Sequence, residues 1–190
     1  MTVGTAAITA IAAAFLVVVV LGWAVVAYNR LVRLRTQVRS SWAQIDVQLK
    51  RRHSLVPNVV ETVKAYAGHE RETFAVVTAA RAAAESAGTG ATTQASAEAA
   101  LSSALGRLLA VAEAYPQLRA NENFAALQTE LARTEDKIAY ARQFFNTAVQ
   151  AYNAAVQSVP TNLIARLGGH RPESYFEATA EERGDVDVRF

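Results

Sequence analysis

The chain has 190 residues, with 19 basic and 17 acidic side chains and no cysteine. This length suits one ordinary domain with a small addition. The absence of cysteine excludes a disulfide framework and a thiolate metal site, and a formal net charge of +2 gives no sign of a nucleic-acid partner. Only 9 glycines and 4 prolines interrupt an alanine-rich sequence. The composition therefore predicts an all-α fold.

The first strong pattern is an apolar stretch near the N-terminus. Residues 6–27 carry no charged side chain, and at about 1.5 Å per residue they can cross the hydrocarbon core of a bilayer. Trp23 and Tyr28 lie near the end of the stretch, where aromatic rings prefer the lipid–water boundary. We predict a transmembrane helix over 6–27, preceded by a short extracytoplasmic end, 1–5. A cleaved signal peptide is the alternative, disfavoured because the start is not basic and the apolar run is long.

Basic residues after this stretch predict its orientation. They are Arg30, Arg33, Arg35 and Arg39. Basic flanks of a membrane span stay in the cytoplasm, so we expect a single-pass protein with its N-terminus outside and its domain inside the cell. Contact between the same arginines and anionic lipid headgroups is compatible with this role.

A row of small residues follows one face of the predicted membrane helix. It consists of Ala6, Ala10 and Ala14. Such spacing lets two membrane helices approach closely. In so alanine-rich a segment the row can also arise by chance, so self-association through it and a row without function both stay open.

Amphipathic segments occupy the rest of the chain. Apolar residues recur at spacings of three and four, which is the helical pattern. The predicted helices span 28–53, 55–86, 96–115 and 121–159, followed by a short helix over 161–167. Pro57 fits the first turn of the second helix, and Asn121 is a plausible N-cap of the fourth. Short links between long helices predict an up-down-up-down, antiparallel four-helix bundle over 28–170, continuous with the membrane helix.

The longest apolar seam lies in the fourth helix. Its members are Phe124, Leu127, Leu131, Thr134, Ile138, Ala141, Phe145, Ala148, Tyr152, Ala155 and Val159. The spacings of three and four alternate over five heptads, as in a helical bundle or coiled coil. From residue 171 the periodicity ends and acidic residues dominate, which predicts a mobile acidic tail over 171–190.

Several blocks of the sequence together resemble the LemA family. They are 28–32, 42–52, 55–63, 66–70, 113–116 and 152–153, and the resemblance covers about residues 25 to 178. It implies a bacterial helical bundle anchored in the plasma (inner) membrane, with its domain in the cytoplasm. It does not imply an enzyme.

The polar residues form no recognisable catalytic or metal-binding motif. His53, His69 and His170 belong to no H-E-x-x-H or Glu-x-x-His pattern. The sequence has no G-x-S-x-G, and Gly88 and Gly90 lack the Gly-Lys that a phosphate-binding loop requires. We therefore expect no catalytic, cofactor or metal site, no small-molecule substrate and no nucleic-acid partner.

A dense run of polar residues surrounds the predicted first corner of the bundle. These corner residues are Trp42, Asp46, Gln48, Lys50, Arg51, Arg52, Asn58 and Glu61. One interpretation is a surface for a partner or a second copy. The other is a solvated helix end, with Asp46 and Lys50 paired one turn apart. Both interpretations stay open.

An aromatic-Asn-x-x-Val pattern occurs three times, at Asn29, Asn146 and Asn153. Asn146 and Asn153 are seven residues apart and so share a helix face beside the seam. We expect them to bond to Asn29 or to another helix and so fix the register of the bundle. Surface asparagines without a partner are the alternative.

Three functional hypotheses follow from these features. The first is a non-enzymatic membrane scaffold that self-assembles, with lipid and a second copy as its partners. The second is an adaptor or regulator of another membrane or envelope protein, such as a membrane protease. The third is an enzyme, which would lose its activity on changing one polar residue such as Asp46 or His69.

Overall fold

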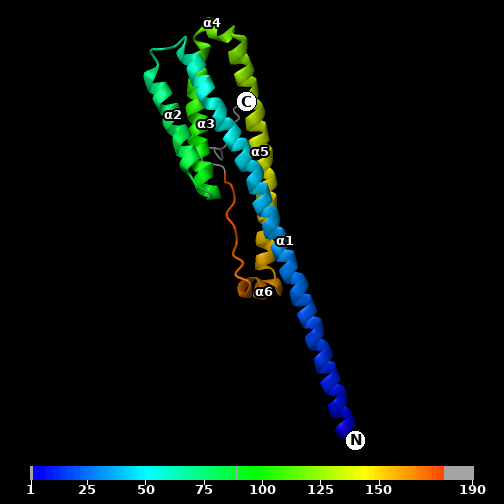
Figure 1. Ribbon diagram of the computed structural model, residues 1–190. Coiled ribbons are helices and arrows are strands. Elements are labelled where there is room, and N and C mark those ends of the chain that lie inside the picture. Colours follow the sequence, from blue (N-terminus) through cyan, green and yellow to red (C-terminus); the bar gives the residue numbers. More distant parts are fainter. Residues whose placement is uncertain (1, 89, 178–190) are drawn as a thin grey trace, which may run out of the picture. The chain divides into compact units, whose positions relative to one another are not determined.

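A computed structural model describes residues 2–88 and 90–177, with side chains from residue 10 onward. The described residues are almost entirely helical and contain no strand (Figure 1). The helices are α1 (Thr2–Lys64), α2 (Arg71–Ser86), α3 (Ala91–Glu113), α4 (Pro116–Arg119), α5 (Glu122–Gln157) and α6 (Thr161–Leu167). The prediction of an all-α fold is confirmed.

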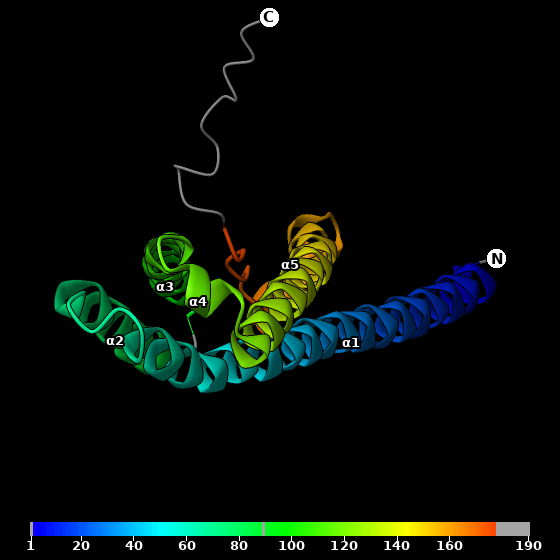
Figure 2. The same ribbon diagram turned by 90° about the horizontal axis from the view of Figure 1, so that it is seen from above.

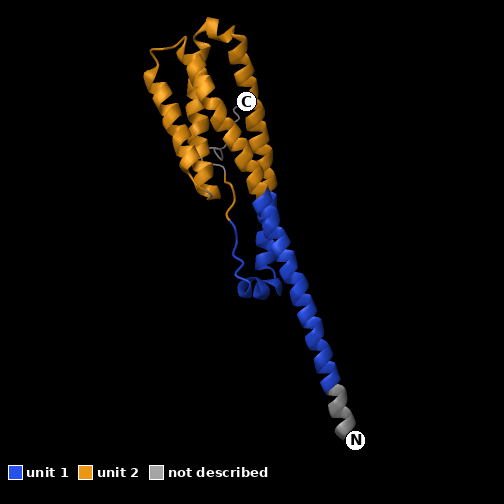
Figure 3. Ribbon diagram, viewed as in Figure 1, with its two compact units in different colours: residues 1–40, 147–173 blue, residues 41–146, 174–190 orange. Residues whose placement is uncertain are grey.

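The chain forms two compact units, each built from segments that are far apart in the sequence (Figure 3). Among the described residues, unit 1 contains 2–40 and 147–173, and unit 2 contains 41–88, 90–146 and 174–177. Helices α1 and α5 each contribute one part to each unit. Within unit 2, α2 and α3 lie side by side (Figure 2).

The first part of α1 is apolar on all sides. Its large side chains are exposed, from 40% for Trp23 to 70% for Ile11, and an 18-residue window reaches a mean hydropathy of 2.8. Among the described residues this is the one stretch long and apolar enough to cross a membrane. Burial begins at Ala27 and Leu31, which are 7% and 0% exposed. The predicted change from an all-round apolar helix to a one-sided helix therefore occurs at Tyr28.

Helix α1 does not end where the sequence predicted. We expected separate helices over 28–53 and 55–86, with Pro57 opening the second. Instead α1 continues through Pro57 to Lys64, and the chain turns over residues 65–70 before α2. The predicted corner near residue 54 is therefore wrong, and the corner residues lie along a continuous helix.

The proline is tolerated because another side chain replaces its missing donor. Pro57 has no N–H, so within a helix the carbonyl of His53, four residues earlier, loses its usual partner. Arg81 of α2 fills this gap, since its Nε donates to His53 O at 2.8 Å. The His53 carbonyl thus keeps a hydrogen-bond donor through a tertiary contact. No local sequence rule predicts this contact.

The core of unit 2 takes residues from every helix that enters the unit. Its fully buried members include Val56, Val59 and Val63 of α1, Val77 of α2, Leu101 and Leu108 of α3, Leu118 of α4 and Phe124 of α5. These positions continue the stripes expected from the sequence. The Asn121 cap is confirmed, because Phe124 N donates to Asn121 Oδ1 at 3.1 Å.

Ten of the eleven predicted seam residues of α5 are buried or half-buried. The eleventh, Val159, is 81% exposed, because α5 ends at Gln157. Helix α6 follows, and its end forms a Schellman motif. Gly169 N donates to Arg166 O, His170 N donates to Ala165 O, and Gly169 has a φ of 68° that favours glycine.

The Arg81 contact gives the first test. We expect Arg81→Met to lower the free energy of unfolding by about 1.5–3 kcal/mol, because it leaves a buried carbonyl without a donor. In a Pro57→Ala background, which restores the helical N–H, the same change should cost clearly less. Urea unfolding of the full chain in detergent, followed by circular dichroism, measures both. An equal cost in the two backgrounds would contradict the explanation.

Candidate functional site

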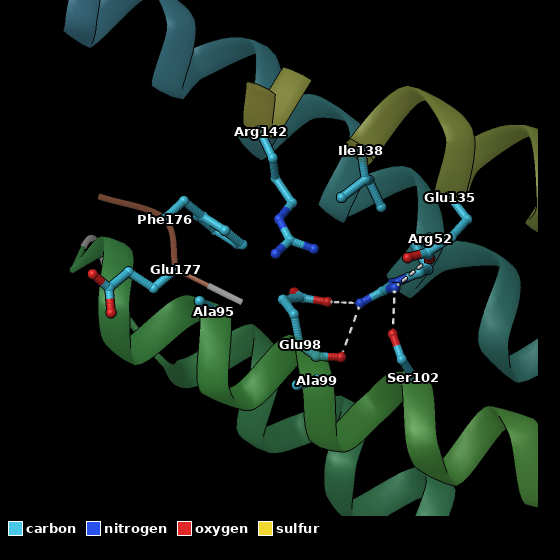
Figure 4. Close-up of a pocket in the computed structure, with 10 residues that line it drawn as sticks. All are labelled: Arg52, Ala95, Glu98, Ala99, Ser102, Glu135, Ile138, Arg142, Phe176 and Glu177. Carbon is cyan, nitrogen blue, oxygen red and sulfur yellow. Dashed lines mark hydrogen bonds and ion pairs between the residues drawn. The ribbon is translucent and has the colours of Figure 1, made fainter. Parts of the chain in front are cut away.

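The most unusual polar feature is an arginine buried in unit 2. Arg52 of α1 is 2% exposed, and its guanidinium forms an ion pair with Glu98 of α3. It also donates to Ser102 Oγ at 3.0 Å and to Glu135 Oε2 of α5 at 2.6 Å. Figure 4 shows the guanidinium reaching toward these groups from the facing helices. One side chain thus ties α1 to α3 and α5.

Glu98 collects further contacts on its other oxygen. His53 Nε2 lies 2.8 Å from Glu98 Oε1, and Gln94 Nε2 donates to the same oxygen at 2.9 Å. Gln94 Nε2 also donates to Ala84 O of α2 at 3.0 Å. We call Arg52, His53, Gln94, Glu98, Ser102 and Glu135 the charged network. Its contacts reach α1, α2, α3 and α5.

The network holds Glu98 ionised in spite of its burial. Burial alone would raise the pKa of this carboxyl, but the hydrogen bond from His53 and the charge of Arg52 outweigh it, so the pKa lies below its usual 4.5. A permanently charged guanidinium and an ionised carboxylate therefore face each other inside the unit. The arrangement neutralises charge but supplies no activated nucleophile.

One cavity beside the network is too small for an organic substrate. A cavity of about 30 Å³ is lined by Arg52, Glu98, Glu135, Arg142 and Phe176, among others (Figure 4). Such a volume holds a water or two. Among the described residues, no group of three or more histidine and acidic side chains is placed to hold a metal ion.

Two larger clefts open on the surface of unit 2. One, of about 580 Å³, has a mixed polar and apolar lining that includes Asp46, Leu49, Lys50, Ala84 and Glu85. The other, of about 370 Å³, lies between α3 and α5. Its lining is Arg52, Ser102, Leu105, Gly106, Leu109, Gln128, Leu131, Ala132 and Glu135, and we call it the α3–α5 groove.

The structure distributes the corner residues over different surroundings. Trp42 packs edge-on against Phe145, with ring centroids 5.4 Å apart, and Arg52 belongs to the buried network. Arg51 pairs with Glu130 of α5. Asp46 and Lys50 pair at 2.7 Å, as the second interpretation expected.

The remaining corner residues are not joined to one another by the contacts described above. Gln48 is half-buried, and Asn58 and Glu61 are exposed on α1. That these residues form a surface for a partner or a second copy stays a prediction.

The asparagines hold the C-terminal segment rather than another helix. Asn146 Oδ1 accepts from Phe176 N at 2.9 Å, and its Nδ2 donates to Phe176 O at 3.1 Å. Asn153 makes the same two bonds to Glu173, at 2.8 Å and 2.9 Å. The expected bond to Asn29 is not what these amides form, and Asn29 is exposed.

The prediction of a mobile tail from residue 171 is therefore wrong for residues 171–177, which we call the strap. Phe176 is 3% exposed and packs near Trp42, with ring centroids 6.0 Å apart, and under Arg142, 5.0 Å from its ring. An asparagine side chain offers the donor and acceptor of a peptide group, so it pairs with an extended strap as a strand would. Residues 178–190 lie outside the described part.

Unit 1 contains a second polar cluster, close to Tyr28. The His170 ring lies edge-on to Tyr28, and His170 Nδ1 is 3.1 Å from the Tyr152 hydroxyl. Burial, with the nearby charge of Arg35, lowers the pKa of His170, and burial raises the pKa of Tyr152. Both groups are therefore neutral at physiological pH. Arg35 also lies 3.6 Å from Glu173 of the strap.

The other residues of interest from the sequence lie on the surface. Arg30, Arg33 and Arg39 are exposed, as are Ala10 and Ala14. Ala6 lies outside the residues whose side chains are described.

The sequence contained a signal for the charged network that we did not use. Gln94 and Glu98 extend the apolar stripe of Leu101, Leu105 and Leu108 backward at the same spacing. Arg52 extends the stripe of α1 in the same way. Polar residues that fall on an apolar stripe indicate a buried polar network. The strap has no such signal, because its partners are backbone groups.

The pKa of Glu98 gives a test with a defined pH window. Because the folded pKa lies below 4.5, the stabilisation by Glu98 is complete above pH 4.5 and is lost as the pH falls through the folded pKa. Glu98→Gln should cost about 3–5 kcal/mol at pH 7, since Arg52 loses its buried anionic partner and keeps only the exposed Glu135. The variant should also remove part of the acid sensitivity. Asp46→Asn, which breaks an exposed pair, is the matched control and should cost under about 0.5 kcal/mol. Urea midpoints at pH 7 and pH 4 decide the matter, and equal effects of the two variants would refute it.

The two asparagine pairs allow a reciprocal test. We expect Asn146→Ala to speed hydrogen exchange of the Phe176 amide, and Asn153→Ala to speed exchange of the Glu173 amide, because each variant removes that amide's acceptor. Each variant serves as the control for the other. Mass-spectrometric exchange with residue resolution measures both. If neither amide responds to its own asparagine, the strap is held by other contacts.

Comparison with known proteins identifies the family of this chain. The sequence model of the LemA family matches residues 41–190. Protein LemA of Metamycoplasma hominis is 24% identical over 160 residues, which are 84% of this chain and 73% of that protein.

A shorter similarity reaches magnetosome proteins. Magnetosome protein MamQ 2 of Paramagnetospirillum magneticum is 32% identical over 83 residues, and magnetosome protein MamQ of Magnetospirillum gryphiswaldense is 31% identical over 83 residues. In both cases the match covers 44% of this chain and 30% of the relative. Since the family match extends over most of its length, this chain belongs to the LemA family.

Proposed function

We propose that this protein is a non-enzymatic, membrane-anchored helical scaffold that presents the α3–α5 groove to another polypeptide at the bacterial plasma membrane. In this proposal α1 is the anchor, with its N-terminus outside the cell and the helical domain in the cytoplasm. The arginines after Tyr28 support that orientation. A second copy of the chain is one partner, and another membrane or envelope protein is the alternative.

The observation that carries the proposal is the α3–α5 groove. Leu105, Leu109 and Leu131 line it, and a Cβ added at Gly106 would meet nothing within 4 Å. The Arg52 and Glu135 side chains lie at its polar edge. An apolar groove between two helices with charged groups at one end is suited to an amphipathic helix or an extended segment.

The strap supports the choice of a polypeptide. Phe176 lines the small cavity together with Ala95 and Ala99 of α3 and Ile138 of α5 (Figure 4). The space between α3 and α5 thus already accommodates an aromatic side chain of an extended segment. The groove offers similar surroundings, since Arg52, Ser102 and Glu135 line both it and the cavity.

The proposed bundle topology has support of its own in unit 2. Trp42 contacts Phe145, and Arg52 contacts Glu135. Rising residue numbers in α1 therefore meet falling numbers in α5, as in an antiparallel pair. An up-down-up-down bundle is the simplest arrangement that continues this pairing.

A photo-crosslinking side chain in place of Leu109 tests the proposal in cell membranes. We expect it to form a protein adduct, whereas the same group in place of Ser103, which is exposed on α3 but does not line the groove, should not. An adduct of twice 20.4 kDa indicates a scaffold of identical copies, and any other mass indicates an adaptor. Equal labelling at the two positions, or none, would refute a role for the groove.

A further inference from the structure

Large apolar side chains are exposed on helix α6 and at Val159, just before it. Leu163 is 58% exposed, Leu167 is 87% exposed, and Val159 is 81% exposed. Leu163 and Leu167 are one helical turn apart and share a face. Ala165, in contrast, is 1% exposed and faces the interior. The helix is thus fixed in orientation, with its leucines directed away from unit 1.

Contacts within unit 1 place the end of α6 beside the end of the candidate membrane span. A Cβ added at Gly168 would lie 3.0 Å from Tyr28 Cε2, so the backbone of Gly168 approaches the Tyr28 ring closely. The His170 ring lies 5.7 Å from the Tyr28 ring. Tyr28 follows Ala27, where burial of α1 begins, and Figure 1 shows α6 beside this part of α1. A helix that leaves the bilayer at Tyr28 therefore brings α6 to the lipid–water boundary.

The charge of unit 1 suits an anionic surface. Residues 1–40 and 147–173 contain six arginines and a single acidic residue, Glu173. Glu173 lies 3.6 Å from Arg35. The other five arginines are all exposed, namely Arg30, Arg33, Arg39, Arg166 and Arg171. Basic side chains next to exposed leucines are the composition of segments that lie in the headgroup region of a bilayer.

We propose that α6 and the turn after it form a second lipid-contact surface, which we call the foot. Leu163 and Leu167 insert at the boundary between headgroups and acyl chains, and Arg166 and Arg171 face the phosphates of anionic lipids. The proposal rests on α1 spanning the membrane. The foot prevents α1 from rotating freely about its own axis, because it adds a second point of attachment beside the span.

Spin labels can test the depth of the foot in the intact protein. The chain has no cysteine, so single cysteines at Leu163 or Leu167 can be labelled without removing others. The protein is placed as one copy per nanodisc, with phosphatidylcholine alone or mixed with phosphatidylglycerol. We expect both labels to collide with oxygen more than with a water-soluble nickel complex. A label at Tyr140, which is 72% exposed in unit 2, should show the reverse.

Three outcomes separate the foot from its rivals. Labels at Leu163 and Leu167 as open to nickel as the Tyr140 label would overturn the proposal. Labels shielded from both reagents would also overturn it, because protein rather than lipid would then cover the foot. A label at Val19 reports on the span itself. Lipid exposure at Val19 with water exposure at Leu167 would sink the foot while leaving the anchor intact.

The arginines give an independent readout. Replacing Arg166 and Arg171 by glutamine should lower the ratio of lipid-contacting to water-exposed label at Leu167 by about fivefold per arginine in the anionic discs. It should have little effect in phosphatidylcholine alone. Arg119→Gln in α4 is the matched control and should leave the ratio unchanged. A loss of equal size in both lipids would show that the arginines stabilise α6 itself and would overturn their role in lipid contact.

Discussion

Arg52 is 2% exposed, yet its guanidinium stays charged at every physiological pH, so unit 2 must supply negative charge wherever that side chain lies. Glu98 and Glu135 meet this need from α3 and α5. Sliding either helix by one turn, or rotating it about its axis, would leave the buried charge of Arg52 without a partner. The loss in free energy of unfolding would exceed that of most packing changes. The charged network therefore selects one register among several that the apolar stripes alone would allow.

The same requirement, that buried polar groups have partners, explains two other features. Pro57 removes a donor from α1, and Arg81 supplies one to His53 O. The strap has no neighbouring strand, and Asn146 and Asn153 supply the missing donors and acceptors. The spacing fits this use. Seven residues of helix and three residues of extended chain both advance by roughly 10 Å. Two asparagines seven residues apart on α5 can therefore bind two strap residues that are three apart, Phe176 and Glu173.

What the sequence allowed us to predict was local. The apolar stripes, the Asn121 cap and the Asp46–Lys50 pair depend on residues within one or two turns of each other. What it hid depended on distant contacts. Pro57 alone predicts a helix start. The contact that lets the helix continue comes from Arg81, which is 28 residues beyond His53, whose carbonyl accepts its hydrogen bond. The composition of the strap predicts a mobile tail, because it gives no indication that the Asn146 and Asn153 side chains of α5 bind the strap backbone. The sequence shows that Gln94 and Glu98 fall on an apolar stripe. Their role in a buried network cannot be predicted without knowing that Arg52 lies opposite them.

The distribution of charge connects these local solutions to function. Unit 1 holds one of the 17 acidic residues, so most of its arginines have no acidic partner within the unit and face outward, beside the exposed leucines of α6. The described residues of unit 2 include 12 acidic residues, and several of them pair internally with Arg51, Arg52 and Arg81. A chain selected only for stability would have no reason to separate charge in this way. The separation is expected if unit 1 meets anionic lipid while unit 2 presents an apolar groove between neutralised helices, because each surface then matches a different partner.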